Sequence, residues 1–131
     1  MNEIPNLDLL QRAVQLSKGL HAATRCFPRD ERSKLAVRIN RATASLRATI
    51  AAACAQGDGA GTATHFRAAS AAAGDLETHL MLARDLGLLS DEAHARLAND
   101  LAKLRGMLAE LTLYRPTAKP ESAPTDEPAS E

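Results

Sequence analysis

The sequence is poor in aromatic residues, carries no net charge and contains no long hydrophobic run. Phe, Trp and Tyr make up only 2% of the 131 residues, and the formal net charge at pH 7 is +0. A balanced charge removes the overall attraction to nucleic acid that a strongly basic domain has. No run approaches the roughly 18–20 apolar residues of a membrane span, and no signal peptide is visible. We therefore expect one cytoplasmic domain that does not associate with membranes.

Residue types that build catalytic or metal sites are also sparse. Cys26 and Cys54 form no Cys-x-x-Cys pair, and we expect buried thiols rather than a disulfide. None of the four histidines has a histidine partner at helical spacing, and the Glu-x-x-His pair of di-iron bundles is missing. The glycine-rich segment lacks the Gly-Lys-Ser/Thr ending of a P-loop, which binds nucleotide phosphates. These absences predict a protein that is not an enzyme and holds no metal or cofactor.

Alanine and leucine are abundant instead. The chain contains 27 Ala and 19 Leu, and both are strong helix formers. Residues that favour strands, such as Val, Ile, Tyr and Phe, are scarce by comparison. This composition predicts an all-α fold.

Proline, glycine and capping residues divide the chain into four expected helices, at about 7–25, 31–56, 62–86 and 91–114. The first should end before Pro28, the glycines of segment 57–61 should separate the second from the third, and Gly87 should end the third. The expected N-terminal caps are Asn6, Asp30, Thr62 or Thr64, and Ser90. Residues 1–114 would then form one domain. The four prolines of segment 115–131 predict a disordered tail.

Apolar residues recur within each expected helix at alternating steps of three and four, which is a heptad-like seam. Four such helices with short connections predict an antiparallel up-down four-helix bundle. The seams comprise Leu9, Ala13, Leu16, Leu20 and Ala23; Leu35, Ile39, Ala42, Leu46 and Ile50; Ala69, Ala73, Leu76, Leu80 and Ala83; and Leu97, Leu101, Leu104, Leu108 and Leu111.

Further alanines lie beside the seams of the second and third helices. One interpretation is that they only fill a tightly packed bundle. The other is that part of this surface meets another subunit, because apolar surface beyond a single stripe marks interaction sites. The candidate oligomer contacts are Ala48, Ala52, Ala68 and Ala72.

Charge is unevenly distributed along the chain. Segment 25–47 has seven basic and two acidic residues, whereas segment 75–100 has six acidic and two basic residues. The basic helix could pair with acidic surface in the bundle or in a neighbouring subunit, or it could bind phosphate or an acidic partner. With only three aromatic residues, a base-stacking platform is not expected. The candidate residues for binding a partner or nucleic acid are Arg32, Lys34, Arg38, Arg41 and Arg47.

Two segments resemble a known family. The segment from Phe27 to Arg32, followed by Leu35, Arg41 and Ala42, is similar to the start of the second helix in the four-helix-bundle proteins encoded by intervening sequences of bacterial 23S rRNA genes. The segment 76–87 looks like the end of the third helix in that family. The resemblance spans about residues 7–114, with the motifs in the same order and at the same separations.

The resemblance implies an up-down bundle that assembles into a barrel-like homo-oligomer, typically a homopentamer, and it implies no enzyme activity. Related accessory proteins of diversity-generating retroelements bind a reverse transcriptase and nucleic acid through basic surface residues. The matching candidates here are Arg32, Arg38, Arg41 and Arg47. Two hypotheses therefore stand: a homo-oligomer that acts through protein–protein contacts, and an accessory protein that binds RNA or a reverse transcriptase.

Overall fold

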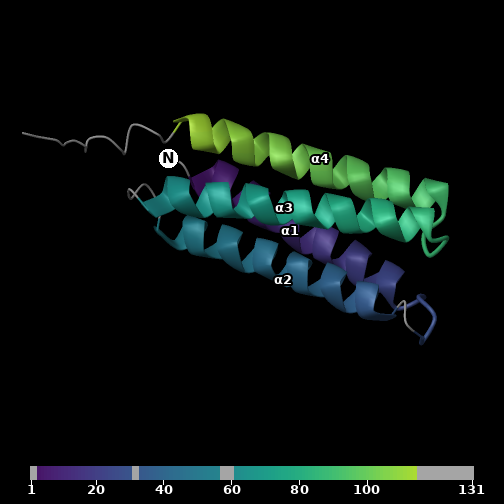
Figure 1. The fold of residues 1–131 in the computed structure, drawn as a ribbon. Coiled ribbons are helices and arrows are strands. Elements are labelled where there is room, and N and C mark those ends of the chain that lie inside the picture. Colours follow the sequence, from purple (N-terminus) through teal and green to yellow (C-terminus); the bar gives the residue numbers. More distant parts are fainter. Residues whose placement is uncertain (1–2, 31–32, 57–60, 115–131) are drawn as a thin grey trace, which may run out of the picture.

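The computed structural model describes residues 3–30, 33–56 and 61–114 and contains four helices (Figure 1). They are α1 (Glu3–Thr24), α2 (Ser33–Gln56), α3 (Gly61–Asp85) and α4 (Asp91–Tyr114). No strand occurs in these described ranges. The all-α class and the number of helices are therefore confirmed.

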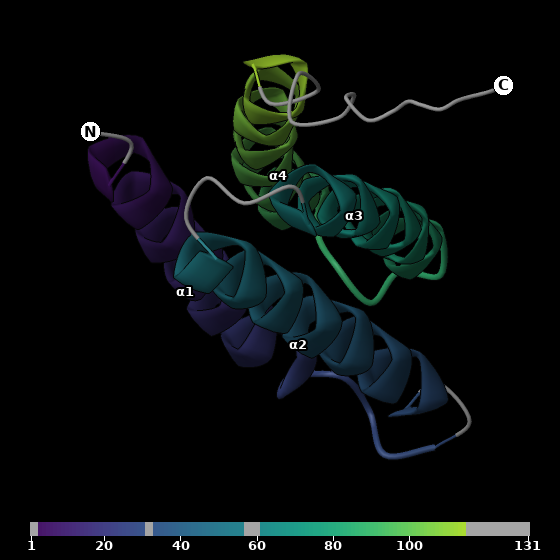
Figure 2. The ribbon, with the colours of Figure 1, turned by 90° about the vertical axis from the view of Figure 1, so that its left-hand side faces the viewer.

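The helices form a bundle in which neighbours along the chain are neighbours in space. The colours of Figure 1 show α1 and α3 running one way and α2 and α4 running the other. Each helix packs against its chain neighbours, and α1 also packs against α4, so the order around the bundle is α1, α2, α3, α4 (Figure 2). Consequently the α2–α3 edge and the α1–α4 edge lie on different sides of the bundle.

The predicted seams form the core. In α3 all five seam residues are buried, and in α4 Leu97, Leu101, Leu104 and Leu108 are at most 2% exposed. Ala23, Ala42 and Leu111 are only partly buried and pack against the core from its margin. On α2 it is Thr43, rather than Ala42, that is buried, and its hydroxyl donates a hydrogen bond of 2.6 Å to the carbonyl of Ile39. This bond satisfies a buried hydroxyl within its own helix.

The connection between α3 and α4 has the predicted stop and start signals. Gly87 has a φ of 78°, and the amides of Gly87 and Leu88 bond the carbonyls of Arg84 and Ala83 at 2.9 and 2.8 Å. These two bonds make a Schellman motif, which needs a residue that tolerates positive φ. Ser90 then caps α4, because its Oγ accepts a hydrogen bond of 3.0 Å from the amide of Ala93.

Several local expectations are wrong. The first helix begins at Glu3 rather than near residue 7, because proline is tolerated in the first turn and Pro5 does not stop it; Asn6 is therefore inside the helix. Thr62 and Thr64 also lie inside α3, which already begins at Gly61. Cys26 is exposed and Cys54 half-buried, so the thiols are free but not fully buried. The expected start of the second helix at residue 31, glycines 57 and 59 and the tail 115–131 lie outside the described residues.

Candidate functional site

A groove of about 270 Å³ lies on the outside of the bundle between α2 and α3. We call it the α2–α3 groove, and its lining consists of Arg38, Arg41, Ala42, Ser45, Ala72, Asp75 and His79. These positions follow the three-and-four spacing of one helix face, with the partly buried Ala42 and Ala72 nearest the core. On α2 and on α3, the sequence therefore places a second row of residues beside the core seam, and these two rows line the groove.

The charged side chains of the α2–α3 groove are not neutralised within the chain. Arg38, Arg41 and Asp75 are exposed and His79 is half-buried. In the described part of the chain, none of the four takes part in a hydrogen bond or an ion pair. The groove thus offers charges of both signs that are available to an external partner.

The predicted oligomer contacts extend this groove along the same helix faces. Ala72 lines it, and Ala68 precedes Ala72 by four residues, which is one turn of helix. On the facing helix, Ala48 and Ala52 follow Ser45 by three and seven residues. Ala48 and Ala68 are exposed, whereas Ala52 and Ala72 are half-buried. One end of this face therefore has Arg38, Arg41 and Asp75, and the other end has the four predicted alanine contacts, with Thr49 and His65 at the same helical spacing.

A second groove of about 620 Å³ lies between α1 and α2. We call it the α1–α2 groove, and it is lined by Val14, Ser17, Lys18 and His21 of α1 and by Asn40, Thr43, Ala44 and Arg47 of α2. The basic residues among them are Lys18, His21 and Arg47, and no acidic residue lines the groove. Its electrostatic character therefore differs from that of the mixed α2–α3 groove.

Hydrogen bonds join the two walls of the α1–α2 groove. Arg47 donates from Nη1 to Ser17 Oγ at 3.2 Å, and Ser17 Oγ donates in turn to the carbonyl of Ala13 at 2.9 Å. At the end of the groove near the α1–α2 connection, Asn40 Nδ2 donates to Thr24 Oγ1 at 3.1 Å. The bond to Ser17 holds the Arg47 guanidinium against α1, and the bond between Asn40 and Thr24 joins the two helices near their connection.

The structure places three of the five predicted binding cations in two different grooves. Arg38 and Arg41 line the α2–α3 groove and Arg47 lines the α1–α2 groove. Lys34 is exposed in the first turn of α2 and already has an interaction, and Arg32 lies outside the described residues. Sequence reasoning missed Lys18 and His21, although their spacing of three residues places both beside the α1 seam.

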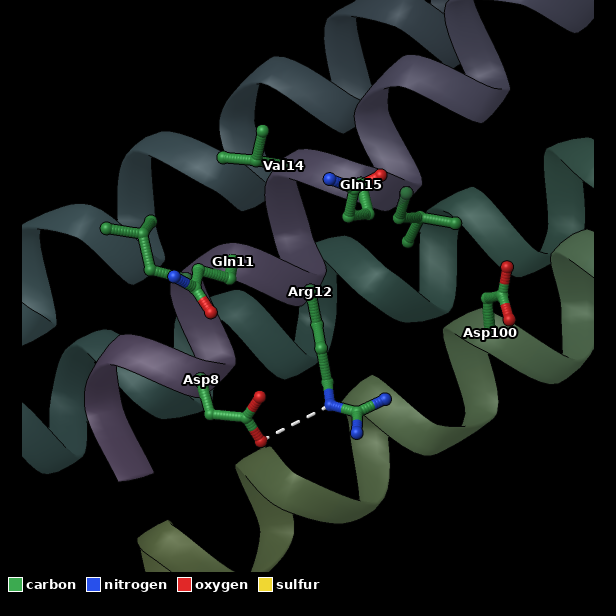
Figure 3. A pocket seen from close by; sticks show the side chains of 8 residues that line it. Asp8, Gln11, Arg12, Val14, Gln15 and Asp100 are labelled. Carbon is green, nitrogen blue, oxygen red and sulfur yellow. Dashed lines mark hydrogen bonds and ion pairs between the residues drawn. The ribbon is translucent and has the colours of Figure 1, made fainter. Parts of the chain in front are cut away.

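A third pocket of about 570 Å³ lies between α1 and α4 (Figure 3). Its apolar wall comes from Leu10, Val14 and Leu16 of α1, and Asp100 comes from α4. Arg12 pairs with Asp8 one turn earlier, with 3.3 Å between Nε and Oδ2. We call this the α1–α4 pocket. It combines partly exposed apolar surface with an excess of acidic side chains.

The described residues contain no group of three or more His, Cys, Asp or Glu side chains that could hold a metal ion. Over the same ranges, no helix is long and apolar enough to cross a membrane.

Four helices around one apolar core, with polar grooves on the outside, define a protein of the helical-bundle class. Comparison with known families is more specific, because the model of the 23S rRNA-intervening sequence protein family matches residues 5–110. The chain belongs to this family, which confirms the resemblance found in segments 27–42 and 76–87. It matches none of the curated proteins with which it was compared.

Proposed function

We propose that this protein is a non-enzymatic homo-oligomer that acts through protein–protein contacts. The observation that carries the proposal is the α2–α3 groove, which has unpaired charges at one end and the predicted alanine contacts at the other. Alanine side chains let a helix of another subunit approach closely, because a methyl group takes up little space between the two helix backbones. Unpaired charges of both signs favour a defined register by selecting complementary partners. A pentamer is the stoichiometry that the family resemblance implies.

The opposite edge of the bundle supports assembly in a ring. A ring forms when one face of each subunit contacts a different face of the next. The α1–α4 pocket offers such a second face, with apolar Leu10 and Val14 and with acidic Asp8 and Asp100. Its acidic excess is complementary to Arg38 and Arg41 in the α2–α3 groove. We propose that these two faces meet between neighbouring subunits.

Sedimentation velocity with a charge-insertion variant tests the assembly. Ala48→Glu/Ala68→Glu places two carboxylates in the proposed contact, where burying an unpaired charge is strongly unfavourable. We expect the wild-type chain to sediment as an oligomer and the variant to dissociate at concentrations on the order of a hundredfold higher. Ala102→Glu/Ala109→Glu on α4 changes two equally exposed alanines outside both grooves and should leave the oligomer intact. A wild-type chain that stays monomeric at every concentration would contradict the proposal.

The second candidate function is that of an accessory protein binding RNA or a reverse transcriptase through basic residues of α2. The observation that favours it is that Arg38 and Arg41 are exposed and that their side chains make no hydrogen bond or ion pair within the described ranges. Such side chains can neutralise backbone phosphates without losing an existing ion pair.

Arg38→Glu/Arg41→Glu tests this second function. We expect binding of a short single-stranded RNA to weaken more than about tenfold and its salt dependence to become shallower, because two phosphate contacts are lost. Fluorescence anisotropy over a series of salt concentrations measures both effects, and the same variant can be tested for capture of a purified reverse transcriptase. Arg67→Glu/Lys103→Glu is the matched control, because both residues are exposed, unpaired and outside the grooves. If the wild-type chain binds neither partner at low salt, the function is rejected.

A further inference from the structure

The α1–α2 groove brings basic residues from two helices to one concave surface. Lys18 and His21 come from α1, one turn apart, and Arg47 comes from the middle of α2. The remaining lining is neutral, with Val14 and Ala44 as apolar members. A concave surface of one charge sign with apolar walls concentrates its field in the cavity, which a flat surface in water does not do.

Some of the hydrogen-bond donors that line this groove are already used within the chain, and others are not. Ser17 and Thr43 donate their hydroxyl protons to helix carbonyls, so neither hydroxyl proton is available to a ligand. Arg47 uses one Nη1 contact with Ser17, and the other guanidinium N–H groups have no partner in the described ranges. The side chains of Lys18 and His21 likewise make no hydrogen bond or ion pair within these ranges. The unused donors are therefore on Lys18, His21 and Arg47, together with the second amide N–H of Asn40.

We propose that the α1–α2 groove binds a phosphate group through Lys18, His21 and Arg47. A phosphate presents several strong acceptor oxygens and up to two negative charges, which matches donors that converge from two helices. The planar guanidinium of Arg47 suits two phosphate oxygens at once, and its contact with Ser17 restricts its orientation. A carboxylate offers only two oxygens and one charge and would leave donors unused. The site is complete within one subunit and needs neither self-association nor Arg38 and Arg41.

Binding of small phosphate compounds is the direct test. Inorganic phosphate and pyrophosphate are titrated into the full chain while the His21 imidazole resonances are followed by NMR. We expect saturable shifts for the wild-type chain. In Lys18→Glu/Arg47→Glu we expect the affinity to fall more than about tenfold, because two contacting cations are replaced by anions. The matched control Arg67→Glu/Lys103→Glu makes the same charge change elsewhere and should retain the affinity.

A second arm of the experiment distinguishes a small phosphate compound from a nucleic-acid backbone. A short single-stranded RNA is titrated against the same variants by fluorescence anisotropy. If the phosphate belongs to RNA, Lys18→Glu/Arg47→Glu lowers the magnitude of the salt slope by about 1.4, since each phosphate contact to a single strand contributes about 0.7. If the ligand is a small compound, pyrophosphate binds and RNA does not. Either pattern supports a phosphate site and identifies its source.

Three results would overturn the proposal. The first is that phosphate, pyrophosphate and RNA all fail to bind at low salt. The second is that the matched control loses as much affinity as Lys18→Glu/Arg47→Glu, because net charge alone would then account for binding. The third is that a poly-glutamate peptide competes as well as RNA, because the groove would then recognise acidic protein. Should the glutamate variant lose its helical circular dichroism, Lys18→Gln/Arg47→Gln makes the same comparison without reversing the charge.

Discussion

Replacement of Phe66 by alanine is expected to destabilise the bundle by about 3–5 kcal/mol, because it removes the largest fully buried side chain of the described residues. Phe66 lies in the second turn of α3 and is 0% exposed. Its removal loses the transfer free energy of the ring and leaves a cavity that the surrounding helices fill only in part. Chemical denaturation should show a lower midpoint with little change in slope.

Phe66→Leu provides the graded control. It keeps an apolar side chain in the same place and should cost only part of the free energy lost in Phe66→Ala. Phe27→Ala is a second comparison, because Phe27 is 7% exposed and lies after the end of α1, where the structure can relax more easily. Equal midpoints for Phe66→Ala and the wild-type chain would contradict the placement of this ring in the core.

Most of the fold could be predicted from the sequence because each helix carries one strong, local signal. The seam of α3 combines alanine with leucine and that of α4 consists of leucine, and nearly all of these side chains are buried. Gly87 and Ser90 act through geometry confined to a few residues, so their roles did not depend on tertiary structure. Asn6 and Thr64 were misread as N-terminal caps, because the helix already begins before each of them. Propensity alone does not locate the end of a helix.

The surface grooves were harder to predict because they depend on two helices at once. Arg38 and Arg47 were grouped by sequence proximity, yet nine residues of α-helix are about two and a half turns. They therefore face opposite sides of α2, and the structure places them in different grooves. Lys18 and His21 join Arg47 only because α1 packs against α2. A helical projection of α2 would have separated the cations, but only the packed bundle shows which residues of α1 they meet.

Core residues and surface residues should affect different properties of the chain. Substitutions in the core should change its stability, and substitutions of exposed charges should change its binding. The seams bury their apolar side chains, whereas Lys18, Arg38, Arg41 and Arg47 are exposed, and Arg47 forms only a hydrogen bond with Ser17. Substitution of an exposed charged residue that has no buried contacts usually changes the free energy of unfolding by less than about 0.5 kcal/mol. Charge variants of either groove should therefore alter binding while the bundle stays folded, so that a loss of binding can be assigned to the changed surface rather than to unfolding.

Leu76→Asp is expected to abolish folding at 25 °C, whereas the same kind of change at Met81 should be tolerated. Leu76 is 0% exposed in the middle of α3, and an aspartate there would have to bury a carboxylate without a partner. A cost above about 4–5 kcal/mol approaches the whole stability of a typical domain. Met81 is 46% exposed on the same helix, so an aspartate there remains hydrated. Far-UV circular dichroism should show a largely unfolded Leu76→Asp chain beside a helical Met81→Asp chain, and a helical, cooperatively melting Leu76→Asp variant would refute the assignment of this seam to the core.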